Sequence, residues 1–416
     1  MKSKIIFFIL FSLTALNSSC ESHKSSQTLT GLDLINKEAM ELISGRKVGI
    51  VTNHTAFNAE GKHLSDILYE MEDVMLTTIF APEHGFRGEA EAGEHLSDDI
   101  DPVTGAKIYS IYGSTRKPTK EMLENVEVLI FDIQDVGARF YTYISTMGYI
   151  MEAGAENGIP VIILDRPNPL GGKVEGPILD MKWSSFVGMY PIPLRHGLTV
   201  GELAQMIKGE GWVNNTESLD LTVIKMKNWD PNMYWKATGL EWIGPSPNIS
   251  NLNQVAVYPG MCLFEATNFS DGRGTDHAFE WVGAGFVQSN ELIQAINQYD
   301  VKGLTIQSHE YMPVDIPGKA MNPKFKDQMI HGLALTVTDW DEFESVRFGV
   351  ICLKVLLDLY PDDFLISRER WLNQLWGNET LGEMLLQNAS VDEIIASYQD
   401  DLNEYRLLKN KYALYK

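Results

Sequence analysis

Short apolar runs alternate with helical patterns along the first half of the chain. Runs of β-prone residues predict buried strands at 47–51, 74–80, 107–112, 126–131 and 160–164. Between them, apolar residues at helical spacing predict helices around 34–43, 63–69, 119–123 and 141–156. Strands that alternate with helices indicate βαβ units, so the pattern predicts an α/β domain with a doubly wound parallel sheet.

Polar side chains gather where four of these strands end. The clusters are Asn53/His54, Glu83/His84/Arg87, Gln134/Asp135/Arg139 and Asp165/Arg166/Asn168. In an open parallel sheet, ligands bind beyond the carboxyl ends of the strands. The pattern therefore predicts a binding site along this edge of the sheet, although it does not name a reaction.

The stretch 81–88, Ala-Pro-Glu-His-Gly-Phe-Arg-Gly, carries the most varied chemistry of these clusters. It offers a carboxyl, an imidazole and a guanidinium within five residues, and its glycines allow tight turns and close approach of a ligand. Glu83, His84 and Arg87 are therefore candidate site residues. The alternative is a loop that is merely charged and solvated.

The second half of the chain follows a Pro- and Gly-rich segment at 175–197, which predicts the crossover to another domain. Helix 199–208 begins with Thr199 and Glu202 at capping-box spacing. Strands are predicted at 221–226 and 333–337, and a helix at 345–358. We expect domains at 31–185 and 186–416, the second of α/β or α+β type, with the active site in the cleft between them.

A second polar, glycine-rich loop follows the apolar run 258–264 and spans residues 265–275. Glu265 is its acid and Arg273 its cation. Hydrolysis of a glycosidic bond needs an acid and a base or nucleophile, and Glu83 and Glu265 have that chemistry, one in each domain. The alternative is that either glutamate only binds sugar hydroxyls; Asp135 and Asp165 are the reserve carboxylates.

Arginines beside glycine- or proline-rich loops predict an anionic group on the substrate, because arginine binds carboxylates in a bidentate way. Structural ion pairs are the alternative for each of them: Arg87, Arg139, Arg166, Arg195 and Arg273. The remaining candidate substrate ligands are polar or aromatic: Asn53, His54, His84, Gln134, Asp135, Tyr141, Asp165, Asn168, His196 and Asn268.

Composition narrows the classes of function. The 416 residues carry a formal net charge of −22, which argues against nucleic acid as a partner, since phosphate binding requires a basic face. The chain has no G-x-G-x-x-G after its first strand and no phosphate-binding G-x-x-x-x-G-K-[ST] loop. It also lacks a zinc-binding H-E-x-x-H motif and a G-x-S-x-G nucleophile elbow. We therefore expect neither a cofactor nor a catalytic metal.

The N-terminus has the pattern of an export signal. Two lysines precede an apolar run from Ile5 to Leu16, which is too short to span a membrane. Leu16-Asn17-Ser18-Ser19-Cys20 resembles a bacterial lipoprotein processing site. We expect a signal peptide at 1–19, lipidation of Cys20 and a polar tether at 20–30, which would attach the protein to the cell envelope through lipid alone, in the periplasm or at the outer membrane.

Five motifs in order resemble the NamZ family of exo-β-N-acetylmuramidases, long described only as a domain of unknown function, DUF1343. They are A-P-E-H-G-F-R-G (81–88), F-D-I-Q-D-V-G-A-R-F-Y-T-Y (131–143), L-D-R-P-N-P-L-G-G (164–172), P-L-R-H-G-L-T-x-G-E-L (193–203) and E-A-T-N-x-S-x-G-R-G-T (265–275). The resemblance covers roughly Gly31 to the C-terminus. It implies removal of terminal N-acetylmuramic acid from non-reducing ends of peptidoglycan fragments during cell-wall recycling. It also implies a Rossmann-like first domain, with Glu83 as the leading catalytic residue.

The resemblance implies a mechanism and a role for the arginines. Glu83 would protonate the leaving oxygen, while Glu265 or the substrate's own acetamido group acts at the anomeric carbon. The lactyl carboxylate of N-acetylmuramic acid would account for the arginines. Two interpretations compete: a lipid-anchored protein that binds muropeptides without chemistry, and an esterase or amidase acting on wall fragments. The missing elbow and zinc motifs weigh against the second.

Overall fold

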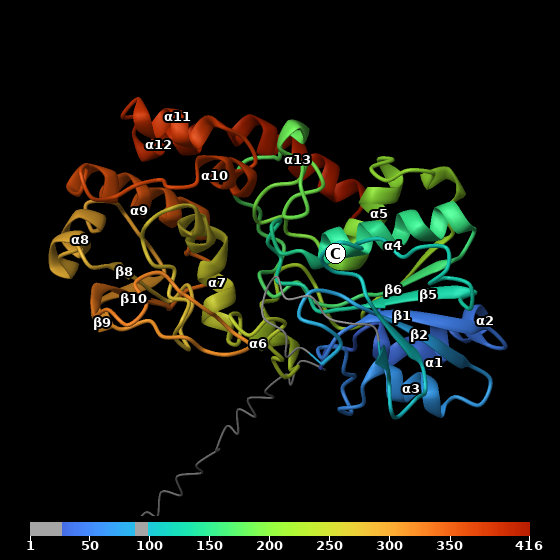
Figure 1. The fold of residues 1–416 in the computed structure, drawn as a ribbon. Helices are drawn as coiled ribbons and strands as arrows, with labels where there is room; N and C mark the ends of the chain where they lie inside the picture. The colour runs from blue at the N-terminus through green and yellow to red at the C-terminus, as the bar shows by residue number, and fades with distance from the viewer. Residues whose placement is uncertain (1–26, 88–98) are drawn as a thin grey trace, which may run out of the picture.

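The computed structural model describes residues 27–87 and 99–416, which form two sheets flanked by helices (Figure 1). The larger sheet has the order β3-β4-β2-β1-β5-β6-β7, and the smaller has the order β8-β10-β9. The larger sheet consists of β1 (Lys47–Thr52), β2 (Met75–Ala81), β3 (Asp99–Ile100), β4 (Lys107–Ser110), β5 (Val128–Asp132), β6 (Val161–Leu164) and β7 (Leu221–Ile224). The predicted signal peptide, the lipidation site Cys20 and most of the tether lie outside the described residues.

The larger sheet is doubly wound, as the alternating pattern predicted. All its pairings are parallel except β3 with β4. The chain winds outward from β1 through β2 to β4 on one side, then crosses back to β5 and continues through β6 to β7. The switch between β1 and β5 is where such sheets bind ligands. The central strands β5 and β6 are buried along their whole length, as expected of strands covered on both faces.

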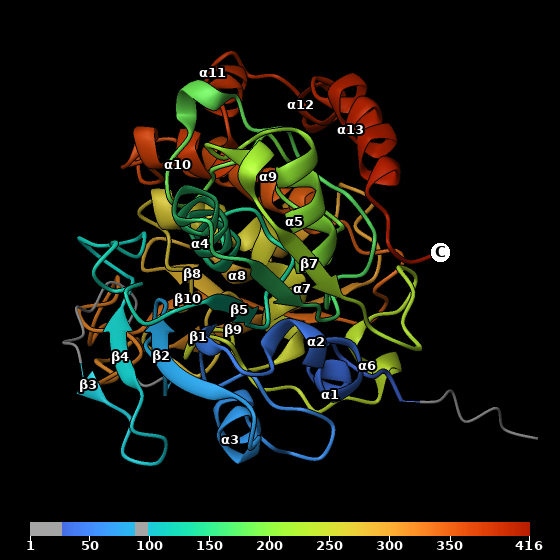
Figure 2. The same ribbon diagram turned by 90° about the vertical axis from the view of Figure 1, so that its right-hand side faces the viewer.

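Helices cover both faces of the larger sheet (Figure 2). One face carries α1 (Ile35–Glu38), α2 (Met40–Ile43) and α3 (Leu64–Glu70), and the other carries α4 (Tyr143–Asn157) and α5 (Val200–Gly209). The predicted capping box at Thr199 and Glu202 is confirmed at the start of α5. A left-handed Gly158 ends α4.

The smaller sheet is antiparallel and made of β8 (Trp281–Ala284), β9 (Leu304–Tyr311) and β10 (Ile330–Val337). The helices of this half are α6 (Trp235–Thr238), α7 (Leu252–Met261), α8 (Ser289–Ile296), α9 (Ser345–Leu359), α10 (Glu369–Trp376), α11 (Thr380–Leu386), α12 (Val391–Ala396) and α13 (Gln399–Lys411). Short 3-10 turns are η1 (Leu32–Leu34), η2 (Met181–Trp183), η3 (Thr216–Ser218) and η4 (Cys262–Ala266).

One hydrophobic core runs through both halves. The apolar cluster beneath α4 includes Phe131 and Met147 and continues without a break to Phe264, Leu353 and Trp376 in the second half. A smaller cluster lies under α1 to α3. Because the larger core is shared, the walls of any cleft between the two halves are held together by the same packing.

The first sheet extends further along the chain than the predicted boundary at residue 185. Helix α5 and strand β7, which we assigned to the second domain, complete this sheet, because β7 pairs in parallel with β6. Helix α13 also returns to the first domain, where Tyr405 and Lys409 donate hydrogen bonds to the carbonyls of His196 and Gly172.

The structure also differs from two smaller predictions. Residues 119–123 form turns instead of the predicted helix. A segment this short makes few helical hydrogen bonds of its own, so its conformation depends on the packing around it. The end of the predicted tether belongs to the folded part, because Thr28 and Leu29 hydrogen-bond to Thr238 and Lys227. Among residues 27–87 and 99–416, no helix is long and apolar enough to cross a membrane.

Candidate active site

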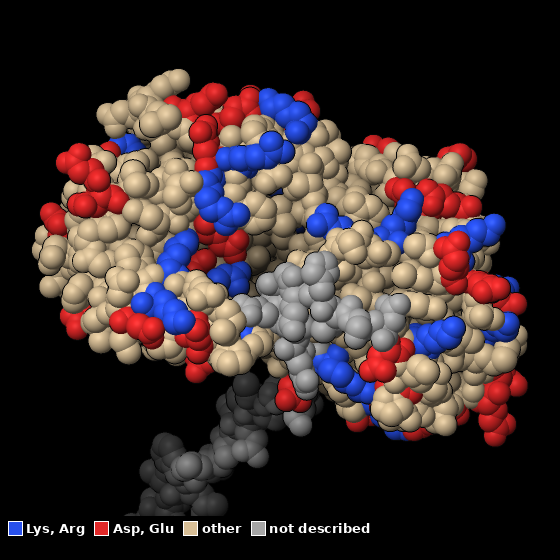
Figure 3. Space-filling view, viewed as in Figure 1, with Lys and Arg blue, Asp and Glu red and all other residues tan. Residues whose placement is uncertain are grey.

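A cavity of about 650 Å³ lies between the two halves of the molecule. Figure 3 shows a hollow in this face, with lysine and arginine side chains gathered around it and acidic side chains within it. Its walls come from both domains: Glu83, His84, Tyr112, Arg116, Phe140, Tyr141, Thr142, Tyr143, Ser185, Phe186, Val187, Ser246, Asn248, Ile249, Tyr258, Cys262, Glu265, Arg273, Phe279, Arg368, Trp371, Gln374 and Leu375.

Glu83 reaches the cavity from the loop that follows β2. Strand β2 ends at Ala81, and the backbone then turns sharply, with φ of +68° at His84 and +75° at Gly85. A histidine in the left-handed region is strained, and such strain concentrates at functional sites. The Oγ1 atom of Thr142 donates a hydrogen bond of 2.5 Å to Glu83 Oε2. The turn therefore aims the carboxyl into the cavity, and Thr142 fixes one of its oxygens.

Tyr143 ties this wall of the cavity to strand β1. Its hydroxyl donates to the carbonyl of Pro245 at 2.7 Å and accepts from Nδ2 of Asn53 at 3.0 Å. Burial, together with the nearby charge of Glu83, raises the pKa of Tyr143 above its usual range. The phenol therefore stays protonated and holds Asn53 behind the wall, where its side chain is fully buried.

Glu265 enters from η4 in the second half and is paired on both oxygens. Its Oε1 lies 2.8 Å from Nη2 of Arg273, and its Oε2 accepts from Nε1 of Trp371 at 3.3 Å. Burial disfavours the charged form of Arg273, but the carboxylates of Glu265 and Asp271 outweigh this and raise its pKa. A carboxylate held in such an ion pair suits a base or charge-stabilising role better than that of a proton donor.

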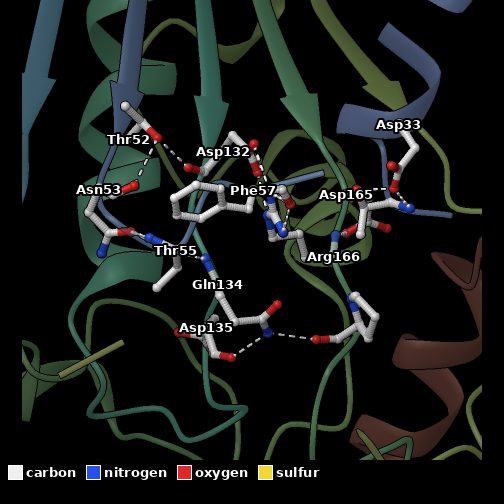
Figure 4. Close-up of polar contacts among 12 residues, drawn as sticks. Asp33, Thr52, Asn53, Thr55, Phe57, Asp132, Gln134, Asp135, Asp165 and Arg166 are labelled. Carbon is white, nitrogen blue, oxygen red and sulfur yellow. Dashed lines mark hydrogen bonds and ion pairs between the residues drawn. The ribbon is translucent and has the colours of Figure 1, made fainter. Parts of the chain in front are cut away.

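Five of the predicted site residues line this cavity. They are Glu83, His84, Tyr141, Glu265 and Arg273. Most of the others lie at the carboxyl ends of the strands, as predicted, but their polar groups are used within the fold, as Figure 4 shows for β1, β5 and β6. The strand pattern therefore predicted where these side chains lie, but not whether they face the cavity or bind within the fold.

The amide of Gln134 and the ring of His196 serve the loop after β5. Nε2 of Gln134 donates to the carbonyls of Asp135 and Pro167, both at 2.8 Å. Oδ2 of Asp135 accepts from the Gly137 N–H at 2.6 Å and lies 3.7 Å from Nε2 of His196. These contacts shape the loop that leads to the cavity wall at Phe140.

Asn168 supports the same loop from β6. Its Oδ1 accepts from Leu170 N and its Nδ2 donates to Leu198 O. A Cβ on Gly137, whose φ is +83°, would lie 2.3 Å from the Asn168 oxygen. Only glycine fits there, so this pair is a packing device.

Four of the five predicted anion-binding arginines lie outside the cavity lining and have partners within the fold. Arg87 pairs with Asp101 at 2.9 Å, and Arg195 with Glu175 at 2.6 Å. Arg166 holds Asp132 with two donors, and its Nη2 lies 2.9 Å from Asp132 Oδ2. In a chain with a large excess of acid, an arginine at a strand end readily finds a carboxylate.

Arg139 is fully buried and binds carbonyl groups only. Its Nη1 donates to Pro177 and Ile192, and its Nη2 donates to Leu375 and Trp376. Burial lowers the pKa of Arg139 to about 9, so the guanidinium is still charged at neutral pH. It joins the first domain to the end of α10, which forms one wall of the cavity.

The last three predicted residues also make contacts away from the cavity. Asp165 is fully buried and accepts hydrogen bonds from Thr199, Gly201 and Tyr415.

Nε2 of His54 bonds to the Gly244 carbonyl at 2.8 Å, and burial lowers the pKa of its imidazole. Asn268 bonds to the backbone of Asp363 and Leu365. Both therefore hold loops in place.

Several cavity residues were not singled out from the sequence. Thr142 and Tyr143 end the motif 131–143, but neither has a type that suggests catalysis by itself. Arg116 and Phe186 come from loops without a strand-end pattern. Trp371 and Gln374 are three residues apart on α10, a spacing that marks one helical face, and Arg368 caps the start of this helix; that spacing was the signal available. Among the described residues, no group of three His, Cys, Asp or Glu side chains is arranged to hold a metal ion.

The fold and the cavity together define a two-domain α/β protein with a glutamate from each domain at one site. The sequence matches the family models described as "Exo-beta-N-acetylmuramidase NamZ, N-terminal" over residues 48–253 and "Exo-beta-N-acetylmuramidase NamZ, C-terminal" over residues 256–415. The chain therefore belongs to the NamZ family.

Relatives agree with this assignment. The chain is 43% identical over 408 residues to the "Peptidoglycan beta-N-acetylmuramidase NamZ" of Bacillus subtilis (strain 168), covering 97% of this chain and 96% of that protein. Crystal structures of two DUF1343 family proteins from Bacteroides fragilis NCTC 9343 are similar, with TM-scores of 0.86 and 0.76 and identities of 33% and 34%. Each comparison covers 94% of this chain and 99% of the other.

Proposed function

We propose that this protein is an exo-β-N-acetylmuramidase that hydrolyses terminal, non-reducing β-1,4-linked N-acetylmuramic acid from peptidoglycan fragments. The observation that carries the proposal is the meeting of Glu83 and Glu265 in one cavity of a NamZ-family chain. Hydrolysis of a glycosidic bond needs such a pair of groups. Membership of the glycoside hydrolases also follows from the 43% identical relative.

In the proposed mechanism Glu83 acts as the acid. One of its oxygens accepts the Thr142 hydrogen bond, which leaves the other to carry a proton to the glycosidic oxygen as the bond to the anomeric carbon breaks. Water then adds to the anomeric carbon and gives its proton to the carboxylate of Glu83 or Glu265. Glu265, or the acetamido group of the substrate, stabilises the positive charge that develops at that carbon.

The test of this proposal is turnover of a chromogenic substrate. A 4-nitrophenyl N-acetyl-β-muramide should release nitrophenol and N-acetylmuramic acid in the presence of the wild-type protein. Saturable binding of the sugar with no product would favour the rival interpretation, a muropeptide-binding protein. Release of peptide or acetyl groups from wall fragments, with intact glycosidic bonds, would favour an amidase or esterase.

We also propose that the protein is exported and anchored to the bacterial envelope through a lipid on Cys20. The support is the apolar run 5–16 followed by Leu-Asn-Ser-Ser-Cys, and both lie outside the described residues. Mass spectrometry of the mature N-terminus should find a lipidated residue 20. Cys20→Ser should move the protein from the membrane fraction to the soluble fraction, and an unchanged distribution would contradict the anchor.

A further inference from the structure

Two arginines of the cavity have no carboxylate partner among the described residues. Arg116 comes from the loop after β4, and Arg368 from the start of α10. Both are exposed, and neither makes an ion pair or a side-chain hydrogen bond within residues 27–87 and 99–416. Each instead lies over an aromatic ring, Arg116 over Phe186 and Arg368 over Trp371. Arg273, in contrast, forms an ion pair with Glu265.

Arg368 is held in place next to the proposed catalytic carboxylate. Its Cζ lies 5.1 Å from the centre of the Trp371 ring, and Nε1 of Trp371 donates to Glu265. Stacking occupies one face of the guanidinium and leaves the N–H groups along its edge available for a planar anion. One aromatic side chain thus positions both the cation and Glu265.

The helix that carries Arg368 is itself fixed. Arg368 is the N-cap residue of α10, and its backbone N–H donates to the carbonyl of Ala266 while its carbonyl accepts from the N–H of Leu372. Trp371 and Gln374 follow at three-residue spacing on the helix, so α10 turns one face toward the cavity. The opposite end of the helix is bound by Arg139 through the carbonyls of Leu375 and Trp376. A ligand contacted by Arg368 therefore meets a preorganised wall.

The charges around Arg368 favour an anion. Burial lowers the pKa of Lys324; Asp271 and Glu265 oppose this effect, and Arg273 and Arg368 add to it. The charges that act on Lys324 are therefore two carboxylates and two further cations, one of which is Arg368. Lys324 donates to the carbonyls of Phe264 and Phe269, and Arg273 is paired with Glu265. Of these cations, Arg368 is therefore the one whose N–H groups are available to bind an anion.

We propose that Arg368 binds the carboxylate of the substrate, the lactyl ether group that distinguishes N-acetylmuramic acid from N-acetylglucosamine. This inference rests on the proposed function and names the specificity-determining residue of that site. Arg116 is the comparison residue, because it lines the same cavity but stacks on Phe186 instead of on Trp371.

The test compares two substrates that differ only in the lactyl group, the 4-nitrophenyl β-glycosides of N-acetylmuramic acid and N-acetylglucosamine. Arg368→Gln should lower kcat/KM for the muramide about 30-fold or more, because a charged hydrogen-bonded pair is lost. The slow reaction of the glucosaminide should change little. Arg370→Gln, an exposed residue on another side of the same helix, should leave both reactions as in the wild type. Arg116→Gln should affect both glycosides equally.

Two results would overturn the proposal. One is an equal loss on both glycosides in Arg368→Gln; the other is a selective loss on the muramide in Arg116→Gln, with Arg368→Gln retaining the preference. A binding measurement separates this proposal from the proposed function. By calorimetry the wild type should bind N-acetylmuramic acid more tightly than N-acetylglucosamine, and Arg368→Gln should remove that difference. If the wild type hydrolyses neither glycoside, the proposed hydrolysis fails, and the calorimetry still decides the role of Arg368.

Discussion

The hydroxyl of Thr142 donates a hydrogen bond to Glu83 instead of capping the helix that it begins. Thr142 occupies the N-cap position of α4, where a threonine side chain usually accepts a bond from the backbone of the first turn, and it makes no such bond. Its Oγ1 lies 2.5 Å from Glu83 Oε2. The chain thus gives up a cap, which typically contributes about 1 kcal/mol, to position a carboxyl group in the cavity.

Glu83→Gln tests the carboxyl directly. The amide has the same shape and its oxygen still accepts from Thr142, but it cannot supply a proton to the leaving oxygen. We expect kcat on the nitrophenyl muramide to fall about 10³-fold with binding of N-acetylmuramic acid retained. Kinetics and calorimetry on the same preparation measure the two quantities. Full activity in this variant would refute the assignment of the acid.

Thr142→Val tests the positioning of that carboxyl. Valine keeps the shape and removes the donor, so kcat should fall about 10-fold or more, while the free energy of unfolding changes by less than about 1 kcal/mol because no cap is lost. Thr142→Ser, which keeps the hydroxyl, should restore most of the rate. A variant that loses stability at unchanged kcat would instead indicate an ordinary structural threonine.

Glu265 is expected to take part in catalysis and also to neutralise Arg273, and two variants can separate these roles. Glu265→Gln should reduce kcat about 10²-fold and also destabilise the protein, since the half-buried Arg273 loses its closest carboxylate. Adding Arg273→Met should restore stability, measured by urea denaturation, without restoring activity. Recovery of activity in the double variant would show that Glu265 serves only to neutralise Arg273.

The strand pattern of the sequence predicted where the site would be, but not which residues would face it. Apolar runs marked β1, β2, β5 and β6 to within two residues at each end. Helix 119–123 was wrong, and the boundary at 185 left β7 out of the sheet to which it belongs. That strand joins the sheet through contacts with β6, which a local pattern does not contain.

Arg166 and Asp165 show why the candidate ligands were harder to predict. They are adjacent and both follow β6, yet each turns to a partner from elsewhere in the chain: Asp132 for Arg166, and Tyr415 for Asp165. Both partners are far away in the sequence, so a local pattern does not predict these contacts. Conversely, Arg368 and Trp371 reach the cavity from a helix near the C-terminus. Trp371 lies on one face of that helix and Arg368 caps its start, and only the fold reveals what they meet.

The buried carboxyl of Asp165 predicts a dependence of stability on pH. Burial raises the pKa of Asp165 to about 7, although hydrogen bonds from Tyr415, Gly201 and Thr199 offset part of the rise. In the unfolded chain an aspartate titrates near pH 3.9. Between about pH 4 and 7 the folded protein therefore keeps a proton that the unfolded chain releases. The contribution of this group to stability is full below pH 4 and is lost as the pH rises to 7.

Asp165→Asn should flatten that dependence. Urea denaturation between pH 4 and 8 should show that the stability of the wild type relative to the variant falls as the pH rises through this window and is constant above it. Because at most one proton is involved, the difference in unfolding free energy should change by at most about 1.4 kcal/mol per pH unit. Burial also raises the pKa of Glu202, so part of the dependence should persist in the variant. Parallel curves for the two proteins would contradict the prediction.

Arg139 is predicted to hold the two halves of the cavity together. Its guanidinium donates to two carbonyls of the first domain and two at the end of α10, and Arg139→Met would leave all four without this partner. At about 1–3 kcal/mol for each buried group, we expect a loss of about 4 kcal/mol or more in the free energy of unfolding. Gly377→Ala is a milder variant for the case in which Arg139→Met does not fold. A Cβ at Gly377 would lie 2.6 Å from Nη2 of Arg139. Gly377→Ala should therefore shift α10 with its Trp371 and raise KM for the muramide more than it lowers kcat. Unchanged stability in Arg139→Met would show that α10 keeps its place without the guanidinium, and unchanged KM in Gly377→Ala would show that crowding Arg139 does not move α10.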